Sequence, residues 1–112
     1  MGMLWHLFER LDTTPGQEKV IREAVEELRD TAKGMRREAR QSGDDVSRAM
    51  RGESFDETVM GEMFARQDDR IRELQKALAG ALIHIHDALD EKQRDRLADF
   101  LESGPRMPFG GP

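Results

Sequence analysis

Apolar residues recur at alternating spacings of three and four along two long stretches of the chain, from about Thr14 to Gln41 and from about Glu57 to Leu89. This rhythm places the apolar side chains on one narrow stripe of an α-helix, as in coiled coils. The stripe of the first stretch is Ile21, Val25, Leu28, Ala32, Met35 and Ala39. The stripe of the second is Met60, Phe64, Gln67, Ile71, Leu74, Leu78, Leu82, Ile85 and Leu89. The pattern therefore predicts two long helices.

Two interruptions separate these stretches. Ser42-Gly43-Asp44 is predicted to end the first helix, with Gly43 as a left-handed C-cap, and a short helix is expected over 44–51. Gly52 to Phe55 forms the second interruption, after which Asp56 caps the second long helix. Because the connection is short, the two long helices are expected to lie antiparallel.

Shorter elements flank this predicted hairpin. An apolar segment comes first (Leu4, Trp5, Leu7, Phe8 and Leu11), suited to packing on the helix ends or to contacting a partner or a membrane. A last helix is expected from Glu91 to about Ser103, where Gly104-Pro105 stops it. The Gly/Pro-rich residues 104–112 are predicted to be a disordered tail. The sequence thus predicts one all-α domain over 4–103, a hooked antiparallel hairpin with short flanking helices.

The same helix-start signal occurs twice, 76 residues apart. Thr14 and Asp90 are good N-cap residues, and Gln17 and Gln93 follow each of them by three positions. Such a Gln side chain can accept a hydrogen bond from the backbone N–H of its cap while the cap side chain accepts one from the Gln backbone. These four residues are therefore expected to be structural caps.

Composition narrows the possible functions. The net charge of −5 argues against a nucleic-acid binder, because phosphate contacts need a basic surface. The chain has no Cys and no Tyr, no glycine-rich phosphate loop and no Glu-x-x-His pair, and its charged residues are expected on outward faces. We therefore expect a protein that is not an enzyme. Both long seams cannot be buried within one hairpin, so a homodimer is expected.

The two capping boxes resemble the L-T-x-x-Q repeats of the Spy/CpxP-like family, which includes periplasmic envelope-stress chaperones and heavy-metal sensors. The second copy reads Leu89-Asp90-Glu91-Lys92-Gln93, with Asp in place of Thr. The first has Thr13 where the family prefers Leu, and Leu11 can take that role. The resemblance implies a cradle-shaped dimer, a periplasmic location and binding rather than catalysis. Met1-Gly2-Met3 leads directly into Leu4, as if a targeting or anchor segment had been removed.

Histidines and carboxylates are the candidate metal ligands. In an antiparallel hairpin the histidines of the second long helix return beside residues 12–14, near the N-terminal segment. Imidazole with carboxylate suits Zn²⁺, Ni²⁺ or Cu²⁺. The candidate ligands are His6, His84, His86, Asp12 and Glu18. Surface or capping histidines are the alternative, and the His-x-x-x-His pair of the family's metal sensors is absent from the first long helix.

Methionine and arginine gather near the predicted turn of the hairpin. The segment from Arg29 to Arg51 contains seven Lys or Arg residues and only four acidic residues. A basic rim around flexible apolar side chains suits the capture of unfolded or membrane-associated proteins. The candidate client-binding residues are Met35, Met50, Met60, Met63, Phe64, Arg36, Arg37 and Arg40. The alternatives are core or dimer packing, a solvated helix face, and Cu(I) binding by the thioethers.

Three functional hypotheses follow. The first is a periplasmic metal-binding or heavy-metal-sensing protein. The second is a holdase chaperone that works without ATP. The third is a structural dimerisation module of a larger, membrane-anchored protein.

Overall fold

The structure, a computed structural model, describes residues 2–103. These form four helices and no strand: α1 (Gly2–Leu11), α2 (Pro15–Arg51), α3 (Glu57–Ala88) and α4 (Glu91–Ser103). None of the described helices is both long and apolar enough to cross a membrane. The tail predicted over 104–112 lies outside the described residues.

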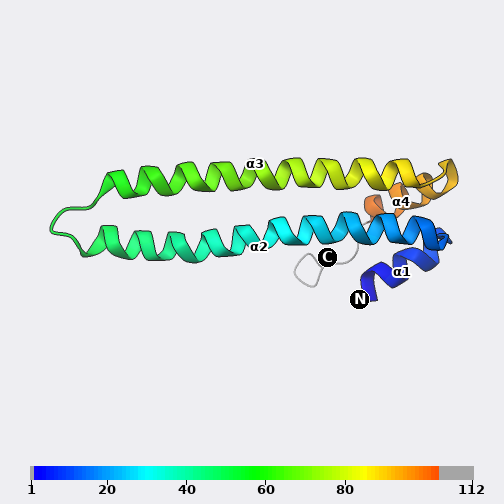
Figure 1. Cartoon of the computed structure of the whole chain (residues 1–112), viewed down its shortest axis with the longest axis horizontal. Coiled ribbons are helices and arrows are strands. Elements are labelled where there is room, and N and C mark those ends of the chain that lie inside the picture. The colour runs from blue at the N-terminus through cyan, green and yellow to red at the C-terminus, as the bar shows by residue number, and fades with distance from the viewer. Residues whose placement is uncertain (1, 104–112) are drawn as a thin grey trace.

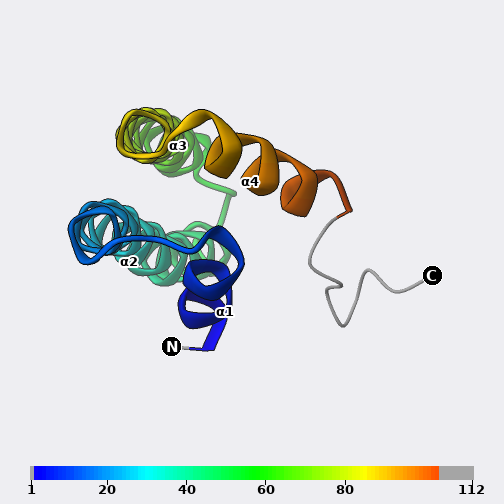
Figure 2. The same ribbon diagram turned by 90° about the vertical axis from the view of Figure 1, so that its right-hand side faces the viewer.

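The two long helices form the predicted antiparallel hairpin. α2 and α3 lie side by side along their lengths and are joined at the distal tip by residues 52–56 (Figure 1). At the open end, α1 and α4 fold back along the hairpin. Seen along its long axis, both short helices lie on the same side of the α2–α3 pair (Figure 2). The expected all-α hooked hairpin is confirmed.

The predicted break at residues 42–44 is wrong, because α2 runs without interruption from Pro15 to Arg51. Gly43 lies inside the helix, and a Cβ there would meet nothing within 4 Å. Ser42 and Asp45 point inward and hydrogen-bond to other side chains. These tertiary contacts outweigh the helix-breaking tendency of a single Gly, which costs about 1 kcal/mol relative to Ala.

The apolar core is concentrated at the open end of the hairpin. All four helices contribute to it or pack against it, so this core fixes the hook. Its buried members are Phe8, Leu11, Ile21 and Leu89, and Leu4, Leu7, Val25, Ile85 and Leu97 pack against them.

The contact between α2 and α3 changes character towards the distal tip. From Gly34 onward, the buried residues of α2 are small or polar: Gly34, Glu38, Ser42, Asp45 and Ala49. The predicted apolar stripe drifts to one side of this contact, so Ala39 at its end is exposed. Val46 and Met50, predicted to lie on a separate short helix over 44–51, continue the stripe within α2 and are exposed as well. The seam predicted from periodicity therefore describes the helix contact only near the open end.

Candidate functional site

Both predicted capping boxes form. Thr14 Oγ1 accepts from the Gln17 backbone N–H at 3.2 Å, and Gln17 Oε1 accepts from the Thr14 N–H at 3.0 Å. At the start of α4 the corresponding distances between Asp90 and Gln93 are 2.8 and 3.0 Å. The four side chains thus begin two helices, as the sequence predicts.

The two glutamines of these boxes also bind each other. Gln17 Nε2 donates to Gln93 Oε1 at 2.7 Å, and Gln93 Nε2 donates back to Gln17 Oε1 at 3.0 Å. Each Nε2 also donates to a carbonyl just before the opposite box, Gln17 to Ala88 and Gln93 to Leu11. The contacts are nearly two-fold symmetric, and they tie the start of α2 to the α3–α4 junction. The side-chain amide of Gln both donates and accepts hydrogen bonds, whereas an ionised carboxylate only accepts them. Glu therefore cannot make the same contacts.

A buried leucine lies shortly before each box and packs in the same junction. Leu89 is buried before the second box, and Leu11 is buried before the first, where Thr13 occupies the usual Leu position. Thr13 instead donates its hydroxyl proton to Glu18 at 3.0 Å. Leu11 therefore replaces the expected leucine, as predicted from the sequence.

The candidate metal ligands are dispersed at this end of the molecule. His6, His84 and His86 are exposed, and His86 lies 3.3 Å from its neighbour Asp87. Asp12 has a φ of 52° and ends α1 in a Schellman-type turn, with Thr13 N–H donating to the Phe8 carbonyl. Glu18 is paired with Arg22 at 3.4 Å. Among residues 2–103, no three His, Asp or Glu side chains form a group that could hold a metal ion.

An apolar stripe extends along each long helix away from the open end. On α2 it continues from Val25 at intervals of seven, which keeps side chains within about 20° of one another per step. On α3 it runs back from Leu82 in steps of four and seven. The stripe residues beyond the hook are Ala32, Ala39, Val46 and Met50 on α2, and Phe64, Ile71 and Leu78 on α3.

Both stripes face the side on which α1 and α4 lie. α1 packs against α2 at Val25, and α4 forms a small groove with α3 at Leu82 and Ile85. Because α1 and α4 lie on one side of the hairpin (Figure 2), Val25 and Leu82 must point to that side as well. The stripes that continue from these two residues therefore form one surface, which α1 and α4 cover only near the open end. We call its uncovered part the distal apolar face.

The methionines predicted to bind clients are divided between this face and the interior. Phe64 is 52% exposed and Met50 is 67% exposed, whereas Met35 and Met60 are half-buried. Met63 is 4% exposed and is buried in the hairpin, so it offers no surface to a ligand. Ile71 and Leu78, each 44% exposed, extend the face beyond the residues proposed from the sequence.

The three arginines proposed from the sequence do not act on one surface. Counted around the helix from Ala39, Arg36 and Arg40 lie about 60° and 100° away, beside the distal apolar face. Arg37 lies about 160° away and lines a separate groove with Glu38, Gln41, Arg66 and Arg70. All three are exposed. Only Arg36 and Arg40 therefore border the apolar surface.

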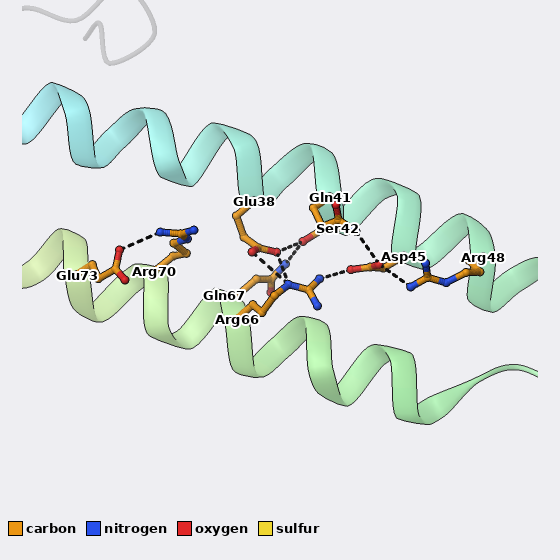
Figure 3. A network of polar contacts seen from close by, with 9 residues as sticks. All are labelled: Glu38, Gln41, Ser42, Asp45, Arg48, Arg66, Gln67, Arg70 and Glu73. Carbon is orange, nitrogen blue, oxygen red and sulfur yellow. Dashed lines mark hydrogen bonds and ion pairs between the residues drawn. The ribbon is translucent and has the colours of Figure 1, made fainter.

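A partly buried polar network joins the helices in the distal half (Figure 3). Arg66 of α3 reaches across to α2, where its Nε lies 3.3 Å from both Glu38 oxygens and its Nη2 binds Asp45. Asp45 also accepts from Arg48 Nη2 at 2.9 Å and from Gln41 Nε2 at 3.2 Å. Ser42 links Glu38 to Gln67 of α3 through hydrogen bonds of 3.1 and 3.0 Å. In the described part of the chain, no buried side-chain nitrogen or oxygen lacks a partner.

The network shifts the pKa of two of its members. Burial by itself raises the pKa of Asp45, but hydrogen bonds from Gln41 and Arg66 and the charges of Arg66 and Arg48 together hold it below its ordinary value. The hydrogen bond to Asp45 raises the pKa of Arg66 further, against the opposing effect of burial, and Glu38 adds to the increase. The ionised forms of both residues are therefore favoured.

The expectation that charged residues occupy only outward faces is wrong at this network. Glu38 and Asp45 are buried, at 8% and 1% exposure. Helical periodicity assigned the interior to the apolar stripe and so placed these acids outside. A signal for them exists in the sequence, since small or polar residues recur at spacings of four and three from Gly34 to Ala49. With two of the four acids between Arg29 and Arg51 buried, the surface of this segment is more basic than its composition suggests.

Comparisons with known proteins agree with the repeated boxes. No curated protein and no solved structure matches the chain. The sequence model of a family described as LTXXQ motif family protein matches residues 2–100, which include both capping boxes and all of α2 and α3. Because this match spans most of its length, the chain belongs to the LTXXQ motif family.

Proposed function

We propose that this protein is a non-catalytic holdase that binds exposed apolar segments of non-native proteins on its distal apolar face. The observation that carries the proposal is the face itself. Phe64, Ile71 and Leu78 are each about half exposed along one line of α3, opposite the exposed Val46 and Met50 of α2. Contiguous exposed apolar surface of this kind marks sites of protein or membrane interaction.

The physical properties of the face suit clients of varied sequence. Met50, the most exposed large side chain of the face, is flexible and can adapt to differently shaped apolar surfaces. Arg36 and Arg40 border the face and can draw acidic segments towards it by electrostatic attraction. The hairpin beneath is held by the polar network, so its apolar stripe is not required for packing in the distal half. The face is therefore available for binding without unfolding the molecule.

The family supports the same proposal. Proteins with LTXXQ motifs are generally periplasmic. The resemblance to Spy/CpxP-like proteins adds envelope-stress chaperones as relatives in function. We therefore place the proposed holdase in the periplasm, where unfolded proteins must be held without ATP.

Matched isoleucines test the role of the face. Ile71 and Ile83 are both exposed on α3, at 44% and 58%, but Ile83 lies about 120° from Ile71 around the helix and so off the face. Suppression of the aggregation of a reduced model protein should fall several-fold for Ile71→Ser with Leu78→Ser. The Ile83→Ser variant should perform as the wild type does. Equal suppression by all variants, or none by the wild type at molar excess, would contradict the proposal.

Matched arginines test electrostatic attraction. Arg36→Glu with Arg40→Glu should slow the capture of an acidic client, whereas Arg37→Glu on the other side of the hairpin should change it little. Salt should reduce the wild-type rate, since the Debye length shrinks to about 3 Å at 1 M ionic strength. Stopped-flow measurement of client binding gives the rates. An equal effect of Arg37→Glu would show that overall charge, and not the edge of the face, matters.

Metal sensing and a structural dimerisation role stay as predictions. The dispersed histidines give metal sensing no geometric support within residues 2–103. Calorimetric titration with Zn²⁺, Ni²⁺ and Cu²⁺ tests it directly. A saturable heat signal that His6→Ala and His86→Ala both weaken about tenfold, equal to about 1.4 kcal/mol each, would favour the sensor hypothesis.

A further inference from the structure

A second apolar concavity lies between α1 and α2, apart from the distal apolar face. Its volume is about 440 Å³. α1 contributes Leu4, Trp5 and Phe8, and α2 contributes Val25 to the apolar lining. Phe8 is buried and forms the floor, whereas Trp5 is 58% exposed and forms a wall. A groove of this size is at the small end of the range that binds small organic molecules.

Charged side chains of α2 line the rest of this groove. Arg22, Glu26 and Arg29 follow one another along the helix, so the lining itself carries two guanidinium groups and one carboxylate. The Arg22 guanidinium lies 5.2 Å from the centroid of the Phe8 ring and forms an ion pair with Glu18 at 3.4 Å. That ion pair uses one of the five N–H donors that an Arg side chain carries. Arg22 can therefore bind a further anion beside the apolar floor.

We propose that this groove binds the monomeric form of a single-chain anionic amphiphile, a medium-chain fatty acid carboxylate. The alkyl chain lies against Trp5, Phe8 and Val25, and the carboxylate is bound by Arg22 and Arg29. The combination of an apolar floor with neighbouring guanidinium groups matches the two ends of such a molecule. An uncharged alkyl chain satisfies only the floor, and an inorganic anion satisfies only the arginines.

A single molecule fits the site better than a membrane surface does. The groove is concave, and its floor at Phe8 is buried, so a flat bilayer cannot reach it. The site thus suits an alkyl chain that has left the membrane.

Trp5 provides a direct measurement, because it is the only Trp in the chain. The full-length protein is titrated with octanoate, decanoate and dodecanoate below their micelle concentrations. Saturable shifts of the Trp5 emission to shorter wavelength are expected. Affinity should rise by up to about fourfold per added CH₂, equal to about 0.8 kcal/mol, and should level off once the chain fills the groove. Decanol and decyltrimethylammonium, which have similar chains, should bind at least about fivefold more weakly than decanoate, because they lack the charge-assisted hydrogen bonds.

Three charge variants test the headgroup contact. Arg29→Gln should weaken decanoate binding about fivefold or more through the lost charge-assisted contact. Glu26→Gln should strengthen it, because an opposing charge is removed. Arg72→Gln removes an exposed arginine of α3 that pairs with Asp69, far from the groove, and should leave the affinity unchanged. Circular dichroism confirms that each variant retains its helices.

Three results would overturn the proposal. Equal binding of decanoate, decanol and the ammonium compound would show non-specific adsorption. If decanoate binds Arg29→Gln and Glu26→Gln with the wild-type affinity, its carboxylate does not lie beside these side chains in the groove. A Trp5 shift with phosphatidylglycerol vesicles but not with monomeric decanoate would assign α1 to a membrane surface. The proposed holdase activity does not depend on any of these outcomes, because it is measured at the distal apolar face.

Discussion

At the residue scale, the paired glutamines show why the repeated box matters beyond helix capping. The Oε1 atom of each Gln accepts from its own cap N–H and from the other Gln, and the Nε2 atom donates to the other Gln and to a backbone carbonyl. Each Gln therefore caps its own helix and also hydrogen-bonds to a segment that is far away in the sequence. The pair therefore acts as a clasp on the open end of the hairpin.

Removing one half of this clasp should destabilise the fold. Gln93 is buried, so Gln93→Ala removes a donor to the Leu11 carbonyl and both hydrogen bonds with the Gln17 amide, and should cost about 1–3 kcal/mol. Gln93→Glu should be no better, because a carboxylate cannot donate to those oxygens. Urea unfolding gives the free energies, with Gln75→Ala on the exposed surface of α3 as the control. If Gln93→Ala lowers the free energy of unfolding no more than Gln75→Ala does, the two capping boxes act independently and their glutamines do not stabilise the junction.

Gly43 offers a second test at this scale. The residue is exposed inside α2 with open space around its Cα, so Gly43→Ala should stabilise the protein by about 0.5–1 kcal/mol. A left-handed C-cap at this position, as the sequence suggested, would instead make Ala destabilising. The sign of the change in thermal unfolding therefore distinguishes a continuous helix from a broken one.

At the scale of the elements, α2 is held to α3 by two kinds of contact. Near the open end, apolar side chains pack in a core. In the distal half, Arg66 bridges Glu38 and Asp45 between small residues such as Gly34 and Ala49. Apolar contacts tolerate changes in pH, whereas ionised contacts do not. The two halves of the hairpin should therefore respond differently to acid.

Acid should loosen the distal half first. The pKa of Asp45 lies below its ordinary value of 3.8 in the folded chain. Its ionised form therefore stabilises the fold above that value, and this stabilisation is lost as the pH falls through the folded pKa. Amide hydrogen exchange at neutral pH and at about pH 3 should show larger loss of protection near Asp45 and Arg66 than around Gln17 and Gln93.

Asp45→Asn is the matched variant for this measurement. It should be less stable than the wild type at neutral pH, because Arg66 and Arg48 lose their charged partner. It should also lose less stability between neutral pH and about pH 3, because the titrating group is gone. If the stability of the two proteins falls in parallel as the pH is lowered, Asp45 does not contribute to the acid response.

At the scale of the whole molecule, the hairpin leaves its apolar surface incompletely covered. Ile85 is half-buried beside α4, but Leu82, Ile71 and Phe64 are each about half exposed. The expectation that one hairpin cannot bury both seams is thus confirmed. A second copy of the chain is one way to cover the remainder, and a client protein is another.

We expect this surface to drive self-association at high protein concentration. Sedimentation velocity across a dilution series should show a monomer–dimer equilibrium, because dimerisation removes apolar side chains from water. Ile71→Ser should shift the equilibrium towards monomer, whereas Ile83→Ser should not. If the protein stays monomeric at every concentration, the distal apolar face is left for clients alone.

The sequence by itself determined the local features of this protein. The capping boxes, the ends of α3 and α4 and the antiparallel hairpin all follow from the identity and spacing of nearby residues such as Thr14, Gln17, Asp90 and Gln93, because caps and helix periodicity are local. Only the tertiary structure decided which face of α2 meets α3. An Arg on one helix can bury two acids of another, and that energy overrides both the break at Gly43 and the apolar stripe. Because the polar face of α2 packs on α3, the apolar stripe is left exposed. For the same reason Arg36 and Arg37 lie on different surfaces of the hairpin.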